Sequence, residues 1–477
     1  MTLIVIPLLP LAAALWALFP QRGRAAAGAT MAAAAAAAGA AWSVALRSAA
    51  GAPTVAISGW IACDGLGALA LVLVAGVNLS AAIFSYGYVS ARLAPAGSRA
   101  ERRYYVDYNL FAGSLLLVPL LSEPALVWIA IELTTLLSVF LVGFTRTRGA
   151  LEAAWKYVVL TLMGAAIALL GFLLLYWALR GAGGAAFTWD GLTAAAPRMP
   201  AGLMQAAFLL VLVGLGAKLG LVPLHTWVPD AYRHAPAPVC ALLSGAEATV
   251  VLYAILRLVP VAAGVPGAHA GGWLIGFGLL SVGVAVFLIL QASDYKHVFA
   301  YSTIEHMGII LVAAGLGGAL ASYGAAAQVL AHSVTKTFCF LAAGAAAVVT
   351  PRREIQGLLR ISPVAGAALL LGGLAIAGAP PLAVFLSEFT IFRAGFAERY
   401  PIAAALLAGF VAVGFFAVMA HVNRAVFGRA GVRKVIPLPG ACVFALAAAS
   451  VPVLWLGVYV PRPVLGLLHQ AALWIGR

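Results

Sequence analysis

Charged side chains are scarce in this sequence: only 9% of its 477 residues are Asp, Glu, Lys or Arg, while 64% are hydrophobic and the mean hydropathy is +1.07. Soluble globular proteins carry about 25% charged residues. This scarcity excludes an ordinary cytosolic enzyme and a disordered protein, and it favours a polytopic membrane protein. The net charge of +14 resembles that of a nucleic-acid binder, but the basic residues are distributed as in a membrane protein, so we expect no nucleic-acid partner.

Cysteine and cofactor motifs are equally sparse. Cys63, Cys240, Cys339 and Cys442 are scattered, without a CxxC pair or a histidine at ligand spacing. No glycine-rich dinucleotide motif follows a strand-like segment, and no P-loop motif occurs. We therefore expect no bound cofactor and no metal site.

Lysine is also rare, with 5 lysines against 23 arginines. Three of the five, Lys156, Lys218 and Lys336, fall inside apolar segments. Arginine stays protonated in proteins, whereas a buried lysine can release its proton. The pattern is compatible with titratable cations inside the membrane, although chance among five residues would also produce it.

Fourteen segments have the apolar character of a membrane-spanning helix, which needs about 20 residues. They lie near 2–19, 27–46, 65–88, 108–121, 124–144, 151–177, 202–221, 237–260, 272–291, 299–317, 322–349, 364–397, 401–422 and 438–460. The seventh and the twelfth are broken by proline pairs, at 218–230 and 377–388. A repeat of five helices would be inverted in the membrane, and paired broken helices are typical of a transport site. Two unrelated proline kinks would look the same.

The basic residues predict the orientation. Odd-numbered loops carry 17 of the 28 Lys and Arg residues, while even-numbered loops and the C-terminal tail carry 7. We expect the odd-numbered loops to be cytoplasmic, both termini to lie outside, the protein to reside in the cytoplasmic membrane, and the tail 461–477 to lie at the membrane interface. The 17 are Arg22, Arg24, Arg92, Arg99, Arg102, Arg103, Arg146, Arg148, Arg233, Lys296, Arg352, Arg353, Arg360, Arg424, Arg429, Arg433 and Lys434; the 7 are Arg47, Arg180, Arg198, Arg257, Arg399, Arg462 and Arg477.

Ionisable residues also occur well inside the apolar segments, at Glu132, Lys218, Glu247, Lys336 and Glu388. A charge at the bilayer centre costs roughly 2.5–3.5 kcal/mol on insertion scales, so pairing or internal water must offset it. Structural ion pairs are one explanation, but separated groups on different helices fit a proton path better. We expect Glu132 to pair with Lys218 and to form a switch, because the lysine can release its proton when the pair opens. A hydrogen-bonded core acid is the alternative for Glu132.

The eleventh segment carries a polar stripe, since Gln328, His332 and Lys336 are spaced i, i+4 and i+8 on one helical face. Histidine titrates near neutral pH and suits proton relay. A packed helix interface held by polar side chains would give the same pattern.

Four further candidates for the proton path lie elsewhere. Glu305 and His306 fall in the tenth segment, and His225 follows the first proline break. Lys156 follows Glu152 at i+4, the spacing of a local ion pair. Each of these residues could equally have a structural role.

The segments that carry these residues resemble one family. The resemblance rests on the strings WIAIELTTLLSVFLVGF, KLGLVPLHTWVPDAYRHAPAPVCALLSG, YSTIEHMGII, AHSVTKTFCFLAAG and PPLAVFLSEFTIFRAGF. They are similar to the antiporter-like membrane subunits of respiratory complex I, of multisubunit cation/proton antiporters and of membrane-bound nickel–iron hydrogenases. Within this family, LEAAWKY, IEHMG and FLSEF most resemble the F subunits of hydrogenase-4, in the formate-hydrogenlyase group.

The resemblance implies an all-α polytopic membrane fold of about fourteen helices with two inverted five-helix repeats, each forming a half-channel. It divides the chain into N-terminal helices over 1–107, a first repeat over 108–262, a second repeat over 272–427, and a last helix with its tail over 428–477. It assigns the proton path to Glu132, Lys218, Lys336 with His332, and Glu388. This chain departs from the family in the eighth helix, where many members carry Lys or His and this chain has Glu247.

The implied function is that of a proton-translocating subunit of a redox-driven complex, of the hydrogenase-4 type and related to NADH:quinone oxidoreductase. Such a subunit holds no redox centre and works with other membrane and peripheral subunits in the lipid bilayer. A subunit of a Na⁺/H⁺ antiporter without a redox partner is the alternative, and a membrane scaffold with a vestigial channel is a third.

Overall fold

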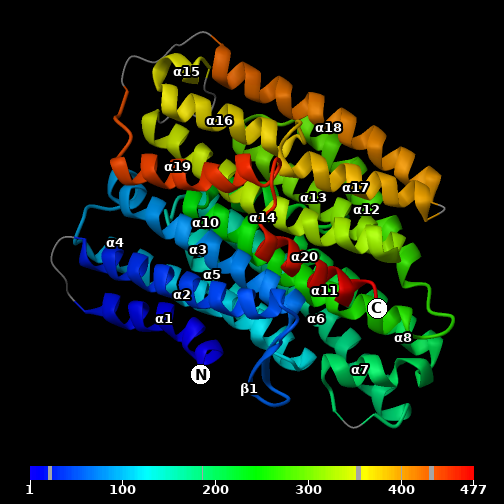
Figure 1. Ribbon diagram of the computed structural model, residues 1–477. Helices are drawn as coiled ribbons and strands as arrows, with labels where there is room; N and C mark the ends of the chain where they lie inside the picture. Colours follow the sequence, from blue (N-terminus) through cyan, green and yellow to red (C-terminus); the bar gives the residue numbers. More distant parts are fainter. Residues whose placement is uncertain (20–23, 185, 351–355, 399, 429–434) are drawn as a thin grey trace.

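The fold is a bundle of helices that run side by side along one common direction (Figure 1). The computed structural model describes residues 1–19, 24–184, 186–350, 356–398, 400–428 and 435–477. Within these ranges, each of the fourteen expected segments is helical. Ten helices of the described chain are long and apolar enough to cross a membrane. The chain is therefore an all-α, multi-pass membrane protein, as predicted.

The long elements follow the predicted order. They are α1 (Thr2–Leu18), α2 (Ala25–Ala49), α3 (Gly65–Arg92), α4 (Arg99–Leu117), α5 (Pro124–Val142), α6 (Arg148–Gly181), α8 (Ala201–Leu219) with α9 (Trp227–His234), α10 (Ala237–Ala241) continuing through the π-helix η3 (Leu242–Glu247) into α11 (Ala248–Ala263), α12 (Ala270–Leu290), α13 (Tyr295–Leu316), α14 (Gly318–Val349), α16 (Pro363–Ile376) with α17 (Ala383–Ala397), α18 (Pro401–Phe427), α19 (Gly440–Trp455) and α20 (Arg462–Ile475).

Short elements lie at the ends of the bundle. Strands β1 (Thr54–Ile57) and β2 (Ile61–Cys63) pair antiparallel, with Thr54 opposite Cys63. The remaining elements are η1 (Val118–Leu120), α7 (Trp189–Ala195), η2 (Ala196–Arg198) and α15 (Leu358–Ile361). Both chain termini lie toward the end of the bundle that carries β1 and α7 (Figure 1).

Two expectations about where helices begin and end are corrected. The fourth helix begins at Arg99 instead of residue 108, because Ser98 caps its first turn by accepting from the Glu101 N–H and the charged residues of that turn hid it from a hydropathy pattern. Arg257, expected in a loop, lies on α11 with 4% exposure. The segment 461–477 forms α20, which packs against α2, α3 and α14, and its location at the membrane interface stays a prediction.

Seven of the basic residues that predict the orientation lie outside the described residues; they are Arg22, Arg352, Arg353, Arg399, Arg429, Arg433 and Lys434. The orientation and the division into 1–107, 108–262, 272–427 and 428–477 remain predictions.

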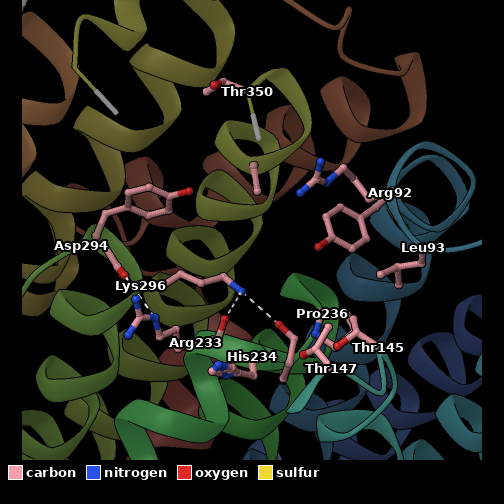
Figure 2. A pocket seen from close by; sticks show the side chains of 14 residues that line it. Arg92, Leu93, Thr145, Thr147, Arg233, His234, Pro236, Asp294, Lys296 and Thr350 are labelled. Carbon is pink, nitrogen blue, oxygen red and sulfur yellow. Dashed lines mark hydrogen bonds and ion pairs between the residues drawn. The ribbon is translucent and has the colours of Figure 1, made fainter. Parts of the chain in front are cut away.

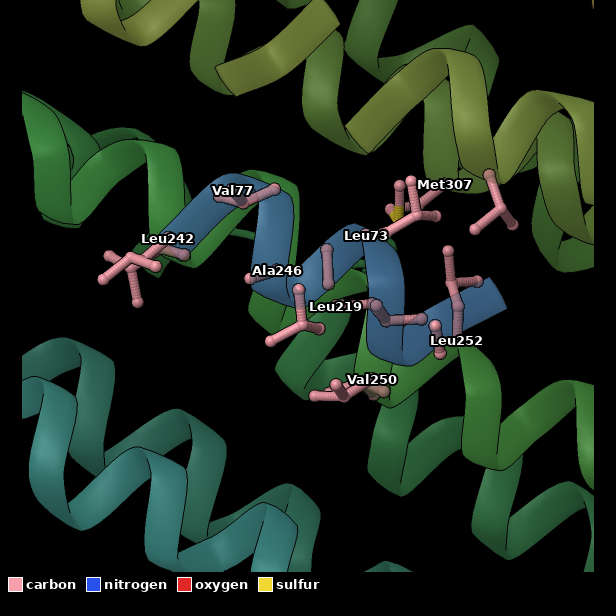
Figure 3. Close-up of a cluster of buried hydrophobic side chains, with 14 of the residues drawn as sticks. Leu73, Val77, Leu219, Leu242, Ala246, Val250, Leu252 and Met307 are labelled. Atoms are coloured by element: carbon pink, nitrogen blue, oxygen red, sulfur yellow. The ribbon is translucent and has the colours of Figure 1, made fainter. Parts of the chain in front are cut away.

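The helix formed by α10, η3 and α11 lies at the centre of the bundle, and every residue of its most apolar window is buried. Figure 3 shows α3 beside it, with Leu73, Val77, Leu242, Ala246 and Val250 in one cluster of buried side chains. Because this helix has no lipid-facing side, any polar group on it must find its partner inside the protein.

The two broken helices are interrupted in the same way. Gly220 after α8 and Gly378 after α16 both have φ of 74°, a left-handed conformation that favours glycine. Proline and leucine follow each glycine at the third and fourth positions, as Gly-Leu-Val-Pro-Leu and Gly-Ala-Pro-Pro-Leu. Since proline has no N–H to continue a helix, each break frees backbone carbonyls in the bundle interior.

We predict that Gly378→Ala lowers the stability of the protein by roughly 1–2 kcal/mol, because an L-residue is strained in the left-handed region. A methyl group there would also lie 2.6 Å from Oε2 of Glu388 and displace that carboxyl group. Thermal unfolding of the purified protein in detergent measures the effect. Gly409→Ala in α18 is the control, because a Cβ at Gly409 meets no atom within 4 Å. Equal melting temperatures for the two variants would contradict the prediction.

Candidate functional site

The first buried charge cluster is built around Lys218, in the last turn of α8 just before the break. Its Nζ lies 2.9 Å from Oε1 of Glu247, and the two side chains are 2% and 4% exposed. Thr135 accepts a second hydrogen bond from Lys218. A buried pair of this kind is stable only when hydrogen bonds satisfy the rest of both groups.

Glu247 meets that condition, because hydroxyl groups surround its carboxylate. Thr134 donates to Oε1 at 2.9 Å, and the Tyr157 hydroxyl lies 3.2 Å from the same oxygen. Ser138 in turn lies 2.8 Å from the Tyr157 hydroxyl. Thr134, Thr135, Ser138 and Tyr157 were not among the predicted site residues, although three hydroxyl residues on one face of an apolar helix are a visible signal.

The predicted Glu132–Lys218 ion pair is wrong in this structure, since Lys218 pairs with Glu247. Glu132 lies close enough to interact electrostatically with both of these residues. Its Oε2 is buried and has no hydrogen-bond partner among the described residues. Lys218 is therefore paired with one carboxylate and lies near a second, that of Glu132, whose Oε2 has no hydrogen-bond partner in the described part of the chain. Sequence spacing could not rank the two acids, because the choice depends on how α5, α8 and η3 pack.

The second cluster follows the polar stripe of α14 to the second break. The rings of His332 and His306 have centroids 5.3 Å apart. His306 Nε2 lies 3.2 Å from the Ile376 carbonyl at the break, and its Nδ1 lies 3.3 Å from Gln328 Nε2. Ser387, beside Glu388 on α17, donates to the Gln328 side-chain oxygen. A carbonyl on one ring nitrogen and an amide donor on the other fit a neutral imidazole of one tautomer.

Lys336 lies near the histidines of the second cluster and is fully buried. Its Nζ donates to the Phe299 carbonyl at 2.7 Å and to Ser302 Oγ at 2.5 Å. Among the described residues it forms no ion pair. Glu305, one turn after Ser302 on α13, is near enough to interact with it electrostatically. Lys336 is therefore held by neutral dipoles, an arrangement that tolerates loss of its proton better than an ion pair does.

The π-helix η3 joins the first cluster to the second. His332 Nε2 lies 3.2 Å from the Ser244 carbonyl, and Ser333 donates to the Gly245 carbonyl at 2.8 Å. The Ser244 hydroxyl is 2.9 Å from that of Thr303. A π-helical turn widens the backbone and is frequent at functional sites. Here its carbonyl groups accept hydrogen bonds from α14 only one turn away from Glu247.

Two predicted candidates lie outside these clusters. Lys156 is exposed on α6, where its Nζ is 2.9 Å from both Glu152 and Asp230, so the predicted Glu152–Lys156 pair is confirmed. His225 is half-buried in the first break, and its Nδ1 has no hydrogen-bond partner among the described residues. The structure brings together Lys218 and Glu247, and separately His306, His332 and the neighbourhood of Glu388.

Two pockets are lined by residues of helices that carry the clusters. Figure 2 shows one of about 230 Å³, with Arg92, Arg233 and Lys296 in its wall. Lys296 donates to the Ala235 carbonyl at 3.0 Å and so holds the end of α9. Asp294 lies 3.7 Å from Arg233.

The other pocket, of about 320 Å³, lies between α14, α17 and the segment joining α19 to α20. Ser387, Thr390 and Arg393 of α17 line it, together with Tyr323 of α14. It gives the Gln328–Ser387 hydrogen bond a space in which water could collect. Nothing in the sequence pattern pointed to this pocket, because its walls come from helices far apart in the chain.

A further ion pair, missed by the sequence analysis, lies near the chain termini. Arg257 of α11 binds Asp64 with both guanidinium nitrogens, at 2.5 and 2.6 Å. The guanidinium also lies over the rings of Tyr253 and Trp474. Burial acts to raise the pKa of Asp64, but Arg257 and the Gly67 N–H outweigh it and hold the pKa below its usual value.

The described residues contain no group of three or more His, Cys, Asp or Glu side chains placed to hold a metal ion. What the clusters offer is a set of proton-binding groups on neighbouring helices, with hydroxyl, amide and backbone carbonyl groups hydrogen-bonded to them. Carboxylates, imidazoles and lysine amines can each take up and release a proton. The chemistry that the arrangement supports is proton transfer along the bundle interior.

Comparison with known proteins gives consistent matches. The family model described as NADH:quinone oxidoreductase/Mrp antiporter, transmembrane, matches residues 123–415. A hydrogenase-4 component F homologue from Methylacidiphilum infernorum (isolate V4) is 36% identical over 414 residues, 84% of this chain and 86% of that protein. NADH-quinone oxidoreductase subunit N from Desulforudis audaxviator (strain MP104C) is 29% identical over 87% of this chain and 84% of that protein.

The fold also matches a solved structure. A chain of the membrane-bound sulfane sulfur reductase, an archaeal respiratory membrane complex, superposes with a TM-score of 0.88. The match covers 99% of this chain and 97% of that chain, at 24% sequence identity. At this identity the likeness establishes the common fold alone.

Proposed function

Because the chain belongs to the transmembrane family of NADH:quinone oxidoreductases and Mrp antiporters, we propose that it is a proton-translocating subunit of a redox-driven membrane complex of the hydrogenase-4 type. The similarity to a hydrogenase-4 component F homologue over most of both chains supports this choice. Electron transfer takes place in partner membrane and peripheral subunits. This chain supplies the proton path.

The observation that carries the proposal is that Lys218 is paired with the buried Glu247 while a second carboxylate, that of Glu132, interacts electrostatically with both residues. Lys218 is bound to Glu247 at 2.9 Å, while Oε2 of the nearby Glu132 is buried and unpaired. Moving the ammonium group from one carboxylate to the other leaves the first without its counter-charge, so that acid takes up a proton. A shift of Lys218 toward Glu132 therefore loads Glu247, and the return movement releases the proton.

From Glu247 the path continues through the second cluster. The proton passes along the η3 turn to His332 and Lys336, then by His306 and Gln328 to Glu388. Internal water bridges the steps that have no direct hydrogen bond, as is common for buried polar sites. The pocket of about 320 Å³ beside Ser387 connects this end of the path to the outside. Glu305 lies near both Lys336 and Glu388 and binds a proton beside the main path.

The predicted orientation is part of the proposal, with odd-numbered loops in the cytoplasm, both termini outside, and the cytoplasmic membrane as the location. Helix α3 begins beside β2 and ends at Arg92, so Arg92 lies at the end of the bundle opposite the termini. The pocket there also contains Arg233 and Lys296. Basic residues gathered at this end support the assignment of its side as cytoplasmic.

Glu388→Gln tests the proposal at the far end of the path. It is expected to lower the number of protons pumped per electron by at least about tenfold, since an amide cannot carry the proton. The assembled complex is reconstituted in liposomes, reduced methyl viologen supplies electrons, and a pH-sensitive dye inside the vesicles reports proton movement. Glu398→Gln is the matched control, because Glu398 is exposed at the end of the same helix α17.

Two results would overturn the proposal. Normal pumping by Glu388→Gln in a fully assembled complex would remove Glu388 from the path. Sodium-dependent proton movement in the absence of an electron donor would instead establish the alternative, a subunit of a Na⁺/H⁺ antiporter.

A further inference from the structure

An exposed ion cluster fastens the short helix α9 to α6. Lys156 Nζ lies 2.9 Å from Glu152 Oε1 on its own helix and 2.9 Å from Asp230 Oδ2 on α9. The three side chains are 45%, 60% and 36% exposed. All three side chains lie on the outer surface of the chain, where a charged group of a partner subunit or a lipid headgroup can compete for Lys156. The contact between α6 and α9 at this point is therefore one that an external charge can open.

Trp227 links the start of α9 to the lysine of the first cluster. Its indole Nε1 donates to the Ala217 carbonyl at 2.8 Å, across the break between α8 and α9. Ala217 is the residue directly before Lys218. Asp230 lies in the first turn of α9, so the exposed cluster and Trp227 hold the same turn.

Tyr157 links the same contact to the carboxylate of the first cluster. Its ring centroid is 4.7 Å from that of Trp227, and its hydroxyl lies 3.2 Å from Glu247 Oε1. Tyr157 also follows Lys156 directly in α6. Both rings are almost completely buried. The Tyr157–Trp227 contact therefore joins two residues that stabilise the Lys218–Glu247 pair: Trp227 is bonded to the carbonyl group next to Lys218, and Tyr157 is bonded to Glu247.

The far end of α9 is held independently of this contact. Lys296 donates to the carbonyl groups of Ala235 and Arg233, at 3.0 and 3.5 Å, and Arg233 lies 3.7 Å from Asp294 (Figure 2). With this end fixed, opening the exposed cluster frees only the beginning of the helix. That is the part that carries Trp227.

We propose that Tyr157 and Trp227 are positioning residues that couple the exposed Glu152–Lys156–Asp230 cluster to the buried Lys218–Glu247 pair. The inference rests on the proposed function and adds a site of control to it. When Lys156 holds Asp230, α9 presses Trp227 against Tyr157 and the pair stays closed. When that contact opens, the indole of Trp227 and the phenol of Tyr157 move together. The Trp227–Ala217 hydrogen bond beside Lys218 and the Tyr157–Glu247 hydrogen bond are then lost at the same time.

A double-mutant cycle tests the coupling in the assembled complex, with protons pumped per electron as the readout. Lys156→Met is expected to change this ratio about two- to fivefold, the range for exposed ion pairs. Tyr157→Phe, which removes only the hydroxyl, is expected to change it about tenfold, because the lost hydrogen bond goes to a charged group. The double variant is expected to match Tyr157→Phe alone, since both changes act through one contact.

Conservative variants separate positioning from a general loss of structure. Lys156→Arg keeps the cation and is expected to restore the normal ratio. Trp155→Phe is the control, because Trp155 is 67% exposed on the same helix next to Lys156. Trp227→Phe keeps a ring against Tyr157 but loses the bond to Ala217, and it is expected to behave like Lys156→Met.

The outcomes distinguish this inference from the proposed function. If the unmodified complex transfers electrons without pumping, the proposed function fails, and the inference fails with it. If the complex pumps but Lys156→Met equals Trp155→Phe, or if the two changes in the cycle are additive, only the coupling is overturned. Non-additivity together with rescue by Lys156→Arg establishes it.

Discussion

Lys218→Met is expected to abolish proton pumping by the assembled complex. Methionine has about the length of lysine but carries no charge, so Glu247 loses the ammonium group that now lies 2.9 Å away. Removing one partner of a buried ion pair leaves an uncompensated charge, at a cost of about 3–5 kcal/mol, unless the remaining group is neutralised. Glu247 is therefore expected to keep a proton permanently. A carboxyl group that never releases its proton cannot relay protons to His332 and Lys336.

Pumping and assembly must be measured together for this variant. Proton movement is followed with a pH-sensitive dye in liposomes, and co-purification of the partner subunits shows that the complex has formed. Lys218→Arg is the informative companion, because arginine keeps the charge but its planar guanidinium binds a carboxylate through two nitrogens and does not move readily from Glu247 to Glu132. It is expected to assemble and not to pump. Normal pumping by the Met variant would contradict the proposed path, and normal pumping by the Arg variant would show that charge alone suffices.

Element type and order could be predicted for this chain because membrane spans are long and strongly apolar. The predictions failed where charge interrupts an apolar run. Helix α4 begins at Arg99 because Ser98 caps a turn rich in charge, and α11 contains Arg257 because Asp64 neutralises it inside the bundle. Both are tertiary or capping effects that a hydropathy window does not contain.

The candidate site was predictable as a list of residues but not as a set of contacts. Buried Glu and Lys residues stand out in apolar helices because each is costly unless it has a partner. Which acid Lys218 selects depends on the packing of α5, α8 and η3, and the structure selects Glu247. The π-helix that brings Ser244 within reach of His332 has no sequence signature comparable to a proline break.

The Asp64–Arg257 pair shows the same principle at the end of the bundle near the termini. The Arg257 side chain is 5% exposed and the Asp64 side chain is 32% exposed. Loss of the counter-charge therefore costs more free energy for the buried arginine than for the partly solvated aspartate. Trp474 of α20 covers the guanidinium, with the ring centre 4.3 Å away. The last helix, α20, therefore covers the buried charge of Arg257, which would destabilise the fold without the counter-charge of Asp64.

Asp64→Asn is accordingly expected to destabilise the protein by about 3–5 kcal/mol, because it leaves a buried guanidinium without a counter-charge. Asparagine caps helices as well as aspartate does, so the cap of α3 is preserved and the charge is the variable. Arg257→Met is expected to cost less, about 1–2 kcal/mol, since the exposed side of Asp64 remains solvated. Chemical unfolding of the purified protein in detergent measures the free energy of unfolding for each variant.

Replacing both residues is the decisive measurement. Asp64→Asn with Arg257→Met removes both charges, and exchange of a whole buried pair for uncharged groups is often neutral, so the double variant is expected within about 1 kcal/mol of the unmodified protein. The pair's own contribution should also depend on pH. Because the pKa of Asp64 is lowered on folding, its stabilisation is complete above the usual aspartate range and is lost as the pH falls through the lowered value. A double variant less stable than Asp64→Asn, or an Asp64→Asn variant that is as stable as the unmodified protein, would contradict this account of the pair.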